Sequence, residues 1–226
     1  AEIALSHWRR DTKVWHKQSD EGPVTEADLE VDTYLKQRLR AARPDYGWMS
    51  EETPDAPAAR DADTLFIVDP IDGTRTFARG EPVWAHSLAV VRNGRPVAAV
   101  VHLPALCVRY AAAAGQGATR DGEPITVGPA PALDRAQMLV TKHTLAPHLW
   151  RGGTPGLVRH FRPSLAYRIA LVAEGRFDGM LTLRASWEWD IAAGALIAEE
   201  AGARVTDRAG RPLLFNAPGR KTAGLV

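Results

Sequence analysis

Asp69-Pro70-Ile71-Asp72-Gly73-Thr74 is the stretch that decides the fold, and it follows the apolar run Leu65-Phe66-Ile67-Val68. The run predicts a buried strand that arrives from the interior of the domain. Pro70 and Gly73 then predict a turn, which carries two carboxylates three residues apart. A β-turn with aspartates at its corners is the simplest interpretation of this pattern.

The six residues of the turn also suit a site for a metal ion and a phosphate. Asp69 and Asp72 would repel each other and raise each other's pKa unless a cation lay between them. Mg²⁺ is held in this way by one or two carboxylates, waters and substrate phosphate. Gly73 lets backbone amides approach an anion closely, and Thr74 adds a hydroxyl beside it. The full string therefore favours a metal–phosphate site over a simple turn.

Two further strings accompany the first, Ser50-Glu51-Glu52 upstream and Trp189-Asp190-Ile191-Ala192-Ala193-Gly194 downstream. In this order the three strings resemble the signature motifs of the inositol monophosphatase superfamily, whose members are Mg²⁺-dependent, lithium-sensitive phosphomonoesterases. The resemblance runs over nearly the whole chain. It implies an α/β fold of layered type, the five-layer αβαβα sandwich of the inositol monophosphatases and fructose bisphosphatases.

The resemblance also implies a metal site. Glu51, Asp69 and the backbone carbonyl of Ile71 would hold one Mg²⁺. Asp69, Asp72 and Asp190 would hold a second, with Asp69 bridging the two ions. A third, weaker ion would depend on Glu51 and waters, and Glu52 would be a neighbour of this group. We therefore expect two to three Mg²⁺ ions, with Mn²⁺ as a substitute.

The string Pro23-Val24-Thr25-Glu26-Ala27-Asp28 opens a helix, because apolar residues recur at helical spacing after it. Thr25 and Asp28 have the spacing of a capping box, in which Thr25 is the N-cap. By resemblance, Asp28 also helps to polarise the attacking water together with Thr74, while the amides of Gly73 and Thr74 bind phosphate. The loop before the helix carries Lys17, which by the same resemblance matches a lysine that the family keeps near an additional metal ion.

Composition narrows the class of protein. The 226 residues are 45% hydrophobic and 24% charged with a net charge of +1, which is typical of a globular protein and gives no electrostatic case for nucleic acid polymers or membranes. No stretch approaches the roughly 20 apolar residues that span a bilayer. The single cysteine, Cys107, excludes an intrachain disulfide and fits a cytoplasmic location, and its apolar surroundings predict a core position.

The order of elements predicts two halves, residues 1–128 with most metal ligands and residues 129–226 with Asp190 and the substrate-selecting face. The first half contains a hairpin, residues 85–92 and 95–102, that turns at Asn93-Gly94. A polar connection is expected over residues 75–80. In the second half we expect strands at 138–141 and 177–183, helices at 164–173 and 191–201 with Asp190 as N-cap, and a strand pair within 204–214.

The substrate is the open question. Inositol monophosphatases carry a glutamate a few residues before the third motif, and this chain has Thr182-Leu183-Arg184 there, with Glu188 later. Ser164-Leu165 and Glu188-Trp189-Asp190 look closer to bacterial 3′(2′),5′-bisphosphate nucleotidases, and Arg184 or Arg168 could meet a second phosphate. This favours the 3′-phosphate of adenosine 3′,5′-bisphosphate as the bond that is cleaved, with contacts from Arg184 and Glu188.

Inositol 1-phosphate and histidinol phosphate stay as alternatives on the same metal centre, because Gly80-Glu81-Pro82-Val83-Trp84-Ala85 resembles those branches. A regulatory or RNA-associated binding protein on a phosphatase fold is the alternative of another class. The balanced charge and the complete carboxylate set argue against it. Because family members are often homodimers, a homodimer is a further expectation.

Overall fold

The structure is a computed structural model that describes residues 1–10, 12–16, 22–54 and 56–226. Its α-helices are α1 (Glu2–His7), α2 (Glu26–Ala42), α3 (Pro57–Arg60), α4 (Thr74–Ala78), α5 (Leu165–Ala173) and α6 (Glu188–Glu200). Its 3₁₀ turns are η1 (Pro104–Leu106), η2 (Leu133–Arg135), η3 (His143–Leu145) and η4 (Pro147–Leu149).

A seven-stranded sheet forms the centre of the molecule, in the order β3-β4-β5-β6-β7-β8-β9. Its strands are β3 (Gly47–Ser50), β4 (Thr64–Asp72), β5 (Ala85–Arg92), β6 (Arg95–Leu103), β7 (Val108–Ala113), β8 (Ala118–Arg120) and β9 (Glu123–Ile125). The pair β3 and β4 is parallel, and every later pair is antiparallel. Residues 65–72 of β4 are all buried, as the apolar run before the first motif predicts.

The predicted hairpin is confirmed as β5 and β6. Asn93 and Gly94 both have positive φ angles, 48° and 74°, which a two-residue type I′ turn requires. The pairing shifts register between Val90 and Val91.

Smaller sheets complete the strand set. The order β11-β10-β12 is a parallel sheet of β10 (Gln137–Val140), β11 (Val158–His160) and β12 (Gly179–Leu181). Two antiparallel pairs join β1 (Val14–His16) to β2 (Pro23–Thr25) and β13 (Ser186–Trp187) to β14 (Lys221–Thr222).

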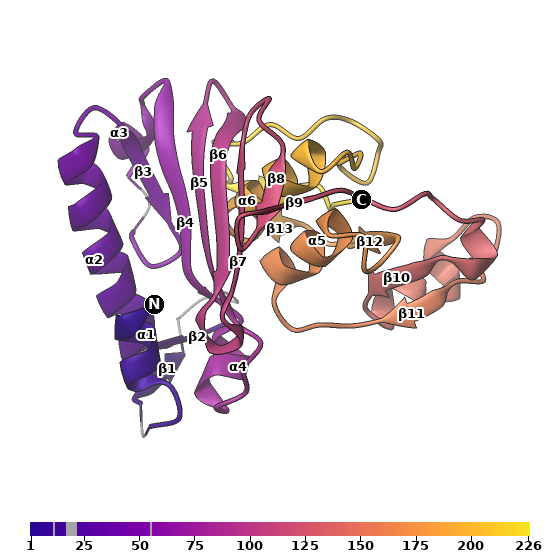
Figure 1. The fold of residues 1–226 in the computed structure, drawn as a ribbon, viewed down its shortest axis with the longest axis horizontal. Helices are drawn as coiled ribbons and strands as arrows, with labels where there is room; N and C mark the ends of the chain where they lie inside the picture. Colours follow the sequence, from indigo (N-terminus) through magenta and orange to yellow (C-terminus); the bar gives the residue numbers. More distant parts are fainter. Residues whose placement is uncertain (11, 17–21, 55) are drawn as a thin grey trace.

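The elements stack in layers (Figure 1). Helices α1 and α2 lie on one side of the central sheet, α5 and α6 lie on the other, and the sheet of β10, β11 and β12 lies beyond α5. The largest apolar cluster fills the space between the central sheet and the pair α5 and α6. Gly194 of α6 lets the two helices approach closely, because a Cβ there would lie 2.9 Å from the Cβ of Ile169. This layered α/β arrangement confirms the predicted fold class.

Several expected elements differ in the structure. Residues 75–80, expected as a polar connection, lie mostly in α4, whose Phe77 ring packs edge-on against Trp84 at 5.0 Å between ring centroids. The expected strand pair within residues 204–214 is absent from the described structure. Asp207 instead closes a tight turn, since its Oδ1 accepts hydrogen bonds from the amides of Ala209 and Arg211 at 2.8 and 2.9 Å.

Two smaller expectations also fail. Cys107, expected in the core, is exposed and has a φ of 53° at the end of η1. Asp190, expected as an N-cap, is the third residue of α6, and Trp187 is the N-cap residue. The helix begins one turn earlier than expected because β13 leads directly into it.

Candidate active site

Three carboxylates from distant parts of the chain meet at one end of the central sheet. Strands β3 and β4 are parallel, so their carboxyl ends lie side by side, and Glu51 follows β3 while Asp69 lies in β4. Asp190 reaches the same place from the first turn of α6. One carboxylate oxygen of each lies within 4.8 Å of the others. The structure therefore brings together Glu51, Asp69 and Asp190 in a group that can hold a metal ion.

Asp69 is the most constrained member of this group. It is 1% exposed, and within the described structure its Oδ1 is buried without a hydrogen-bond partner. Burial raises the pKa of Asp69 well above its usual range, and the neighbouring charges of Glu51, Asp72 and Asp190 raise it further. An unpartnered buried carboxylate oxygen is costly unless a cation meets it. An all-oxygen donor set suits a hard ion such as Mg²⁺, so these residues fit the ion that the sequence predicts.

Asp190 also has a raised pKa, and two arginines partly counteract the rise. Burial is the main cause that raises its pKa, followed by the charges of Asp72 and Glu51. Arg184 and Arg168 act in the opposite direction, because their positive charges favour the ionised carboxylate. The first turn of α6 adds the positive end of a helix dipole.

Asp72 directs one of its carboxylate oxygens toward α5. Its Oδ2 accepts hydrogen bonds from the Ser164 hydroxyl and the Ala166 amide, both at 2.6 Å. Burial raises the pKa of Asp72, while the bonds from Ser164 and Ala166 counteract that rise. Ser164 is the N-cap of α5 and accepts from the Tyr167 amide. No site role was predicted for Ser164 from the sequence, although a serine just before an apolar helical pattern is a signal for a cap.

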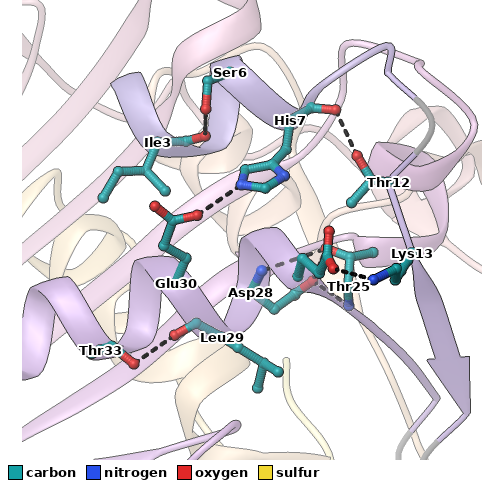
Figure 2. Close-up of polar contacts among 11 residues, drawn as sticks. Ile3, Ser6, His7, Thr12, Lys13, Thr25, Asp28, Leu29, Glu30 and Thr33 are labelled. Atoms are coloured by element: carbon teal, nitrogen blue, oxygen red, sulfur yellow. Dashed lines mark hydrogen bonds and ion pairs between the residues drawn. The ribbon is translucent and has the colours of Figure 1, made fainter.

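Asp28 and Thr25 form the predicted capping box at the start of α2 (Figure 2). Oδ2 of Asp28 accepts from the Thr25 amide at 2.8 Å and from the Thr25 hydroxyl at 2.5 Å. Oδ1 accepts from the Thr74 hydroxyl at 3.2 Å, so the structure joins Asp28 to the first motif. Burial raises the pKa of Asp28 to about 7.

The first motif ends β4 in an irregular pairing. Asp69 pairs with Ser87 and Asp72 with Ala85, so two residues, Pro70 and Ile71, lie opposite His86 alone. The His86 Nδ1 bonds the Pro70 carbonyl oxygen at 2.5 Å, and burial lowers the pKa of His86 to about 4. Because a carbonyl only accepts, Nδ1 carries the proton of a neutral imidazole. His86 thus fixes the bulge, a role that the sequence analysis missed.

Ile71 and Gly73 shape the rest of the motif. The Ile71 carbonyl oxygen lies 3.0 Å from the Thr74 hydroxyl and is an alternative acceptor to Asp28, because a hydroxyl has one hydrogen to donate. Gly73 has a φ of 101°, and a Cβ there would lie 3.3 Å from the Val83 carbonyl oxygen. A glycine is therefore required at this close approach.

Asp32 positions Glu51 through hydrogen bonds to the residues on either side of it in the sequence. It lies one helical turn after Asp28 on α2, and its carboxylate accepts from the hydroxyls of Ser50 at 2.5 Å and Thr53 at 2.9 Å. These two residues enclose Glu51 and Glu52 in the sequence, so Asp32 fixes the turn that presents Glu51. The spacing of Asp28 and Asp32 on one helix face was the available signal.

A cavity of about 370 Å³ opens above the carboxylates. We call this space the catalytic cavity. Its wall includes the four carboxylates and three further residues of the first motif: Glu51, Asp69, Asp72, Asp190, Ile71, Gly73 and Thr74. Its other described wall residues include three cations and two aromatic rings: Arg75, Arg79, Arg184, Phe161 and Trp187. Negative charge at the floor and positive charge at the rim suit a metal ion below a phosphate.

Two residues considered for substrate binding lie elsewhere. Glu188 is fully buried, and its carboxylate accepts from the amides of Asn216 at 2.5 Å and Ala217 at 2.8 Å. Its predicted contact with substrate is therefore wrong in this structure, because both oxygens hold the loop at 216–217. Arg168 is also buried and donates to the carbonyl oxygens of Ser164 and Pro163. Lys17 lies outside the described residues.

Comparisons with known proteins match nearly the whole chain to one family. The inositol monophosphatase family model matches residues 1–224. A protein of Thermotoga maritima named fructose-1,6-bisphosphatase/inositol-1-monophosphatase is 35% identical over 211 residues, 92% of this chain and 80% of that protein. The 3′(2′),5′-bisphosphate nucleotidase CysQ of Salmonella typhimurium is 32% identical over 211 residues, 87% of this chain and 81% of that protein.

A solved structure of a Thermotoga maritima inositol monophosphatase is also similar. It matches with a TM-score of 0.83 at 32% identity, over 99% of this chain and 86% of that chain. The relatives differ in the substrates that their names give. Of the helices in the described ranges, none combines the length and the apolar character needed to cross a membrane.

Proposed function

The chain belongs to the inositol monophosphatase family and is a phosphatase, and on this premise we propose that its natural reaction is the Mg²⁺-dependent removal of the 3′-phosphate from adenosine 3′,5′-bisphosphate. The observation that carries the metal-dependent reaction is the group of Glu51, Asp69 and Asp190. Their oxygens lie within 4.8 Å of one another, and the buried Oδ1 of Asp69 has no protein partner in the described structure.

In this proposal Glu51, Asp69 and Asp190 would hold two to three Mg²⁺ ions. Asp72 completes the set from the side of α5, and the carbonyl of Ile71 adds a neutral oxygen. When bound, Mg²⁺ supplies neutralisation of phosphate charge and lowers the pKa of coordinated water. Mn²⁺ has the same preference for oxygen ligands and is expected to substitute.

Asp28 and Thr74 orient the attacking water. The Thr74 hydroxyl donates to Asp28, which leaves its oxygen lone pairs free to accept a hydrogen bond from water. Because burial raises the pKa of Asp28 to about 7, this carboxylate is a stronger base than an exposed aspartate. The amides of Gly73 and Thr74, at the start of α4, then bind the phosphate oxygens.

The preference for a nucleotide rests on the walls of the catalytic cavity. Glu188 is committed to the loop at 216–217 and offers no carboxylate to inositol hydroxyls. The wall of the catalytic cavity instead presents the exposed cation of Arg184 and the ring of Phe161, which is 46% exposed. A cation suits a second phosphate and an aromatic ring suits a base, so these walls favour a bisphosphate nucleotide over a polyol phosphate.

The test is phosphate release with Mg²⁺ from adenosine 3′,5′-bisphosphate, inositol 1-phosphate and histidinol phosphate, each with and without lithium. We expect kcat/KM to be highest for the nucleotide and all release to stop in EDTA. A higher kcat/KM for inositol 1-phosphate or histidinol phosphate would overturn the substrate proposal and leave the reaction type standing. Release that persists in EDTA would overturn the metal-dependent mechanism.

A further inference from the structure

A second cavity, of about 400 Å³, shares a wall with the catalytic cavity. Arg184 lines both of them, so a ligand above the carboxylates could extend past this side chain into the second space. The remaining wall comes from the segment after β10, which provides Thr141 and His143, and from the loop that carries Arg208. The two cavities together have the volume of a nucleotide-sized site.

The electrostatic character of the second cavity is cationic. It contains two guanidinium groups, Arg184 and Arg208, and none of its described wall residues is an aspartate or glutamate. The Arg208 Nη1 donates to the carbonyl oxygen of Leu183 at 3.1 Å. That bond holds the Arg208 side chain against the residue that precedes Arg184. Two guanidinium groups in the wall of one cavity, with no carboxylate among the described residues of that wall, favour an anion there.

The backbone keeps Arg208 in this place. Gly224 has a φ of 80°, and a Cβ there would lie 2.7 Å from the Thr182 carbonyl oxygen and 3.2 Å from the Cβ of Arg208. Thr182 and Leu225 also exchange two backbone hydrogen bonds of 2.9 Å. The Arg208 loop therefore packs closely on the strand end that leads to Arg184.

Hydroxyl groups add neutral donors to the wall of the second cavity. Thr141 and Thr144 hydroxyls lie 2.8 Å apart, and either can donate to the other. One hydroxyl hydrogen is used in that contact, which leaves the other available to a ligand. Charged donors with a neutral hydroxyl are the usual surroundings of a phosphate in a protein.

We propose that the second cavity is the subsite for the second phosphate of the substrate, held between Arg184 and Arg208. This inference rests on the proposed function, because it places the 5′-phosphate of adenosine 3′,5′-bisphosphate there while the 3′-phosphate lies over the carboxylates. Arg208 is then a specificity residue: it touches the substrate far from the bond that is broken.

The first experiment compares kcat/KM for adenosine 3′,5′-bisphosphate with kcat/KM for adenosine 3′-monophosphate, which lacks the second phosphate. The ratio of the two values should fall about tenfold in Arg208→Gln, as expected for one charge-assisted contact. In Arg208→Lys this ratio should lie between those of Arg208→Gln and the wild type, since the positive charge remains. Arg211→Gln is the matched control, because Arg211 is an exposed arginine of the same loop that lines neither cavity. An unchanged ratio in Arg208→Gln would overturn the subsite.

A second experiment measures binding of adenosine 5′-monophosphate by calorimetry in EDTA, where no hydrolysis can occur. This probe carries only the phosphate that the subsite should hold, and we expect its Kd to rise at least tenfold in Arg208→Gln but not in Arg211→Gln. If the wild type does not prefer the bisphosphate yet this dependence on Arg208 holds, the proposed function fails and the subsite stands. If the wild type prefers the bisphosphate and Arg208→Gln binds the probe normally, the subsite fails and the function stands.

Discussion

Asp69 illustrates how one residue can serve function at the cost of stability. Its carboxylate is buried beside Glu51, Asp72 and Asp190, and burial with these like charges raises its pKa. Without a cation the ionised side chain is unfavourable for the folded state. A neutral side chain of the same shape at this position would therefore relieve the metal-free protein.

The prediction is that Asp69→Asn stabilises the protein in EDTA and removes its response to Mg²⁺. At a pH near 8 we expect Tm in EDTA to rise by about 2–4 °C, the shift that roughly 1 kcal/mol produces in a chain of this size. Phosphate release should be lost. Thermal unfolding with EDTA and with Mg²⁺ checks both effects. Asp134→Asn, at an exposed position, is the control and should leave Tm unchanged. A variant that is less stable than wild type in EDTA would contradict this account.

Asp28 combines a helix cap with a proposed catalytic role, and a single substitution separates them. In Asp28→Asn the amide oxygen can still accept from the Thr25 amide, but the nitrogen cannot act as a base. We expect kcat to fall about 100-fold, the usual effect of a lost general base, with little change in KM. Steady-state kinetics measure both values, and Glu30→Gln on the exposed side of the same helix is the control. Unchanged kcat would reduce Asp28 to a cap.

Single residues were predicted from the sequence where a motif is local, and missed where a role depends on distant contacts. The capping box of Thr25 and Asp28 is complete within four residues, so its geometry followed directly from spacing. Glu188 was misassigned because its partners, the amides of Asn216 and Ala217, are 28 and 29 residues away. His86 was missed for the same reason, since its partner Pro70 lies across a strand pair.

At the scale of elements, the N-terminal ends of three helices position the polar side chains of the site. The first turns of α2, α5 and α6 carry Asp28, the cap Ser164 and Asp190, and they reach the carboxyl end of β4 from both sides of the sheet. Each start brings the positive end of a helix dipole to a region crowded with carboxylates. Moving one of these helices would therefore disturb the site even without a change in any site residue.

Gly194→Ala tests this coupling, because it places a methyl group 2.9 Å from the Ile169 Cβ where α5 and α6 meet. Overpacking of this kind costs about 1–3 kcal/mol, which exceeds the gain in helix propensity. Chemical unfolding of the variant should show that loss. Ile169→Ala removes the Cδ1 and Cγ2 atoms at 2.9 and 3.1 Å but keeps Cβ, so in that background the same substitution should cost less stability than in the wild type. If the substitution lowered the free energy of unfolding equally in the two backgrounds, the contact between residue 194 and the Ile169 side chain would not be the cause of the loss.

The elements that the sequence did not predict lack local signals. Helix α4 depends on the positive φ of Gly73 and on the contact of Phe77 with Trp84, neither of which appears in the polar composition of residues 75–80. Residues 204–214 alternate like a strand but find no partner strand in the described structure. The amides of Ala209 and Arg211 bond the Asp207 side chain instead, and those of Thr206 and Arg208 bond the carbonyl oxygens of Val226 and Ala223. By contrast, the hairpin at Asn93-Gly94 is specified by two adjacent residues and was predicted correctly.

At the scale of the whole molecule, charge and stability are linked through pH. Asp28, Asp69, Asp72 and Asp190 all have raised pKa values in the folded state, that of Asp28 from 3.8 to about 7. Between the unfolded and folded pKa values, the folded protein therefore holds protons that the unfolded chain has lost. The contribution of these aspartates to the free energy of unfolding is full below about pH 4, and it is lost as the pH rises through their pKa values in the folded state. His86 acts in the opposite sense between pH 6.5 and about 4, since its pKa is lowered.

The difference in Tm between Mg²⁺ and EDTA isolates the carboxylates, because His86 contributes equally to both conditions. Mg²⁺ binds the ionised group and competes with protons, so its stabilisation of the folded state should grow with pH. We expect a small difference near pH 5 that increases steadily to about pH 8, and differential scanning calorimetry at fixed ionic strength measures it. Asp190→Asn should flatten the rise, while Asp134→Asn should not. A difference that is independent of pH would show that the cation binds away from these buried carboxylates.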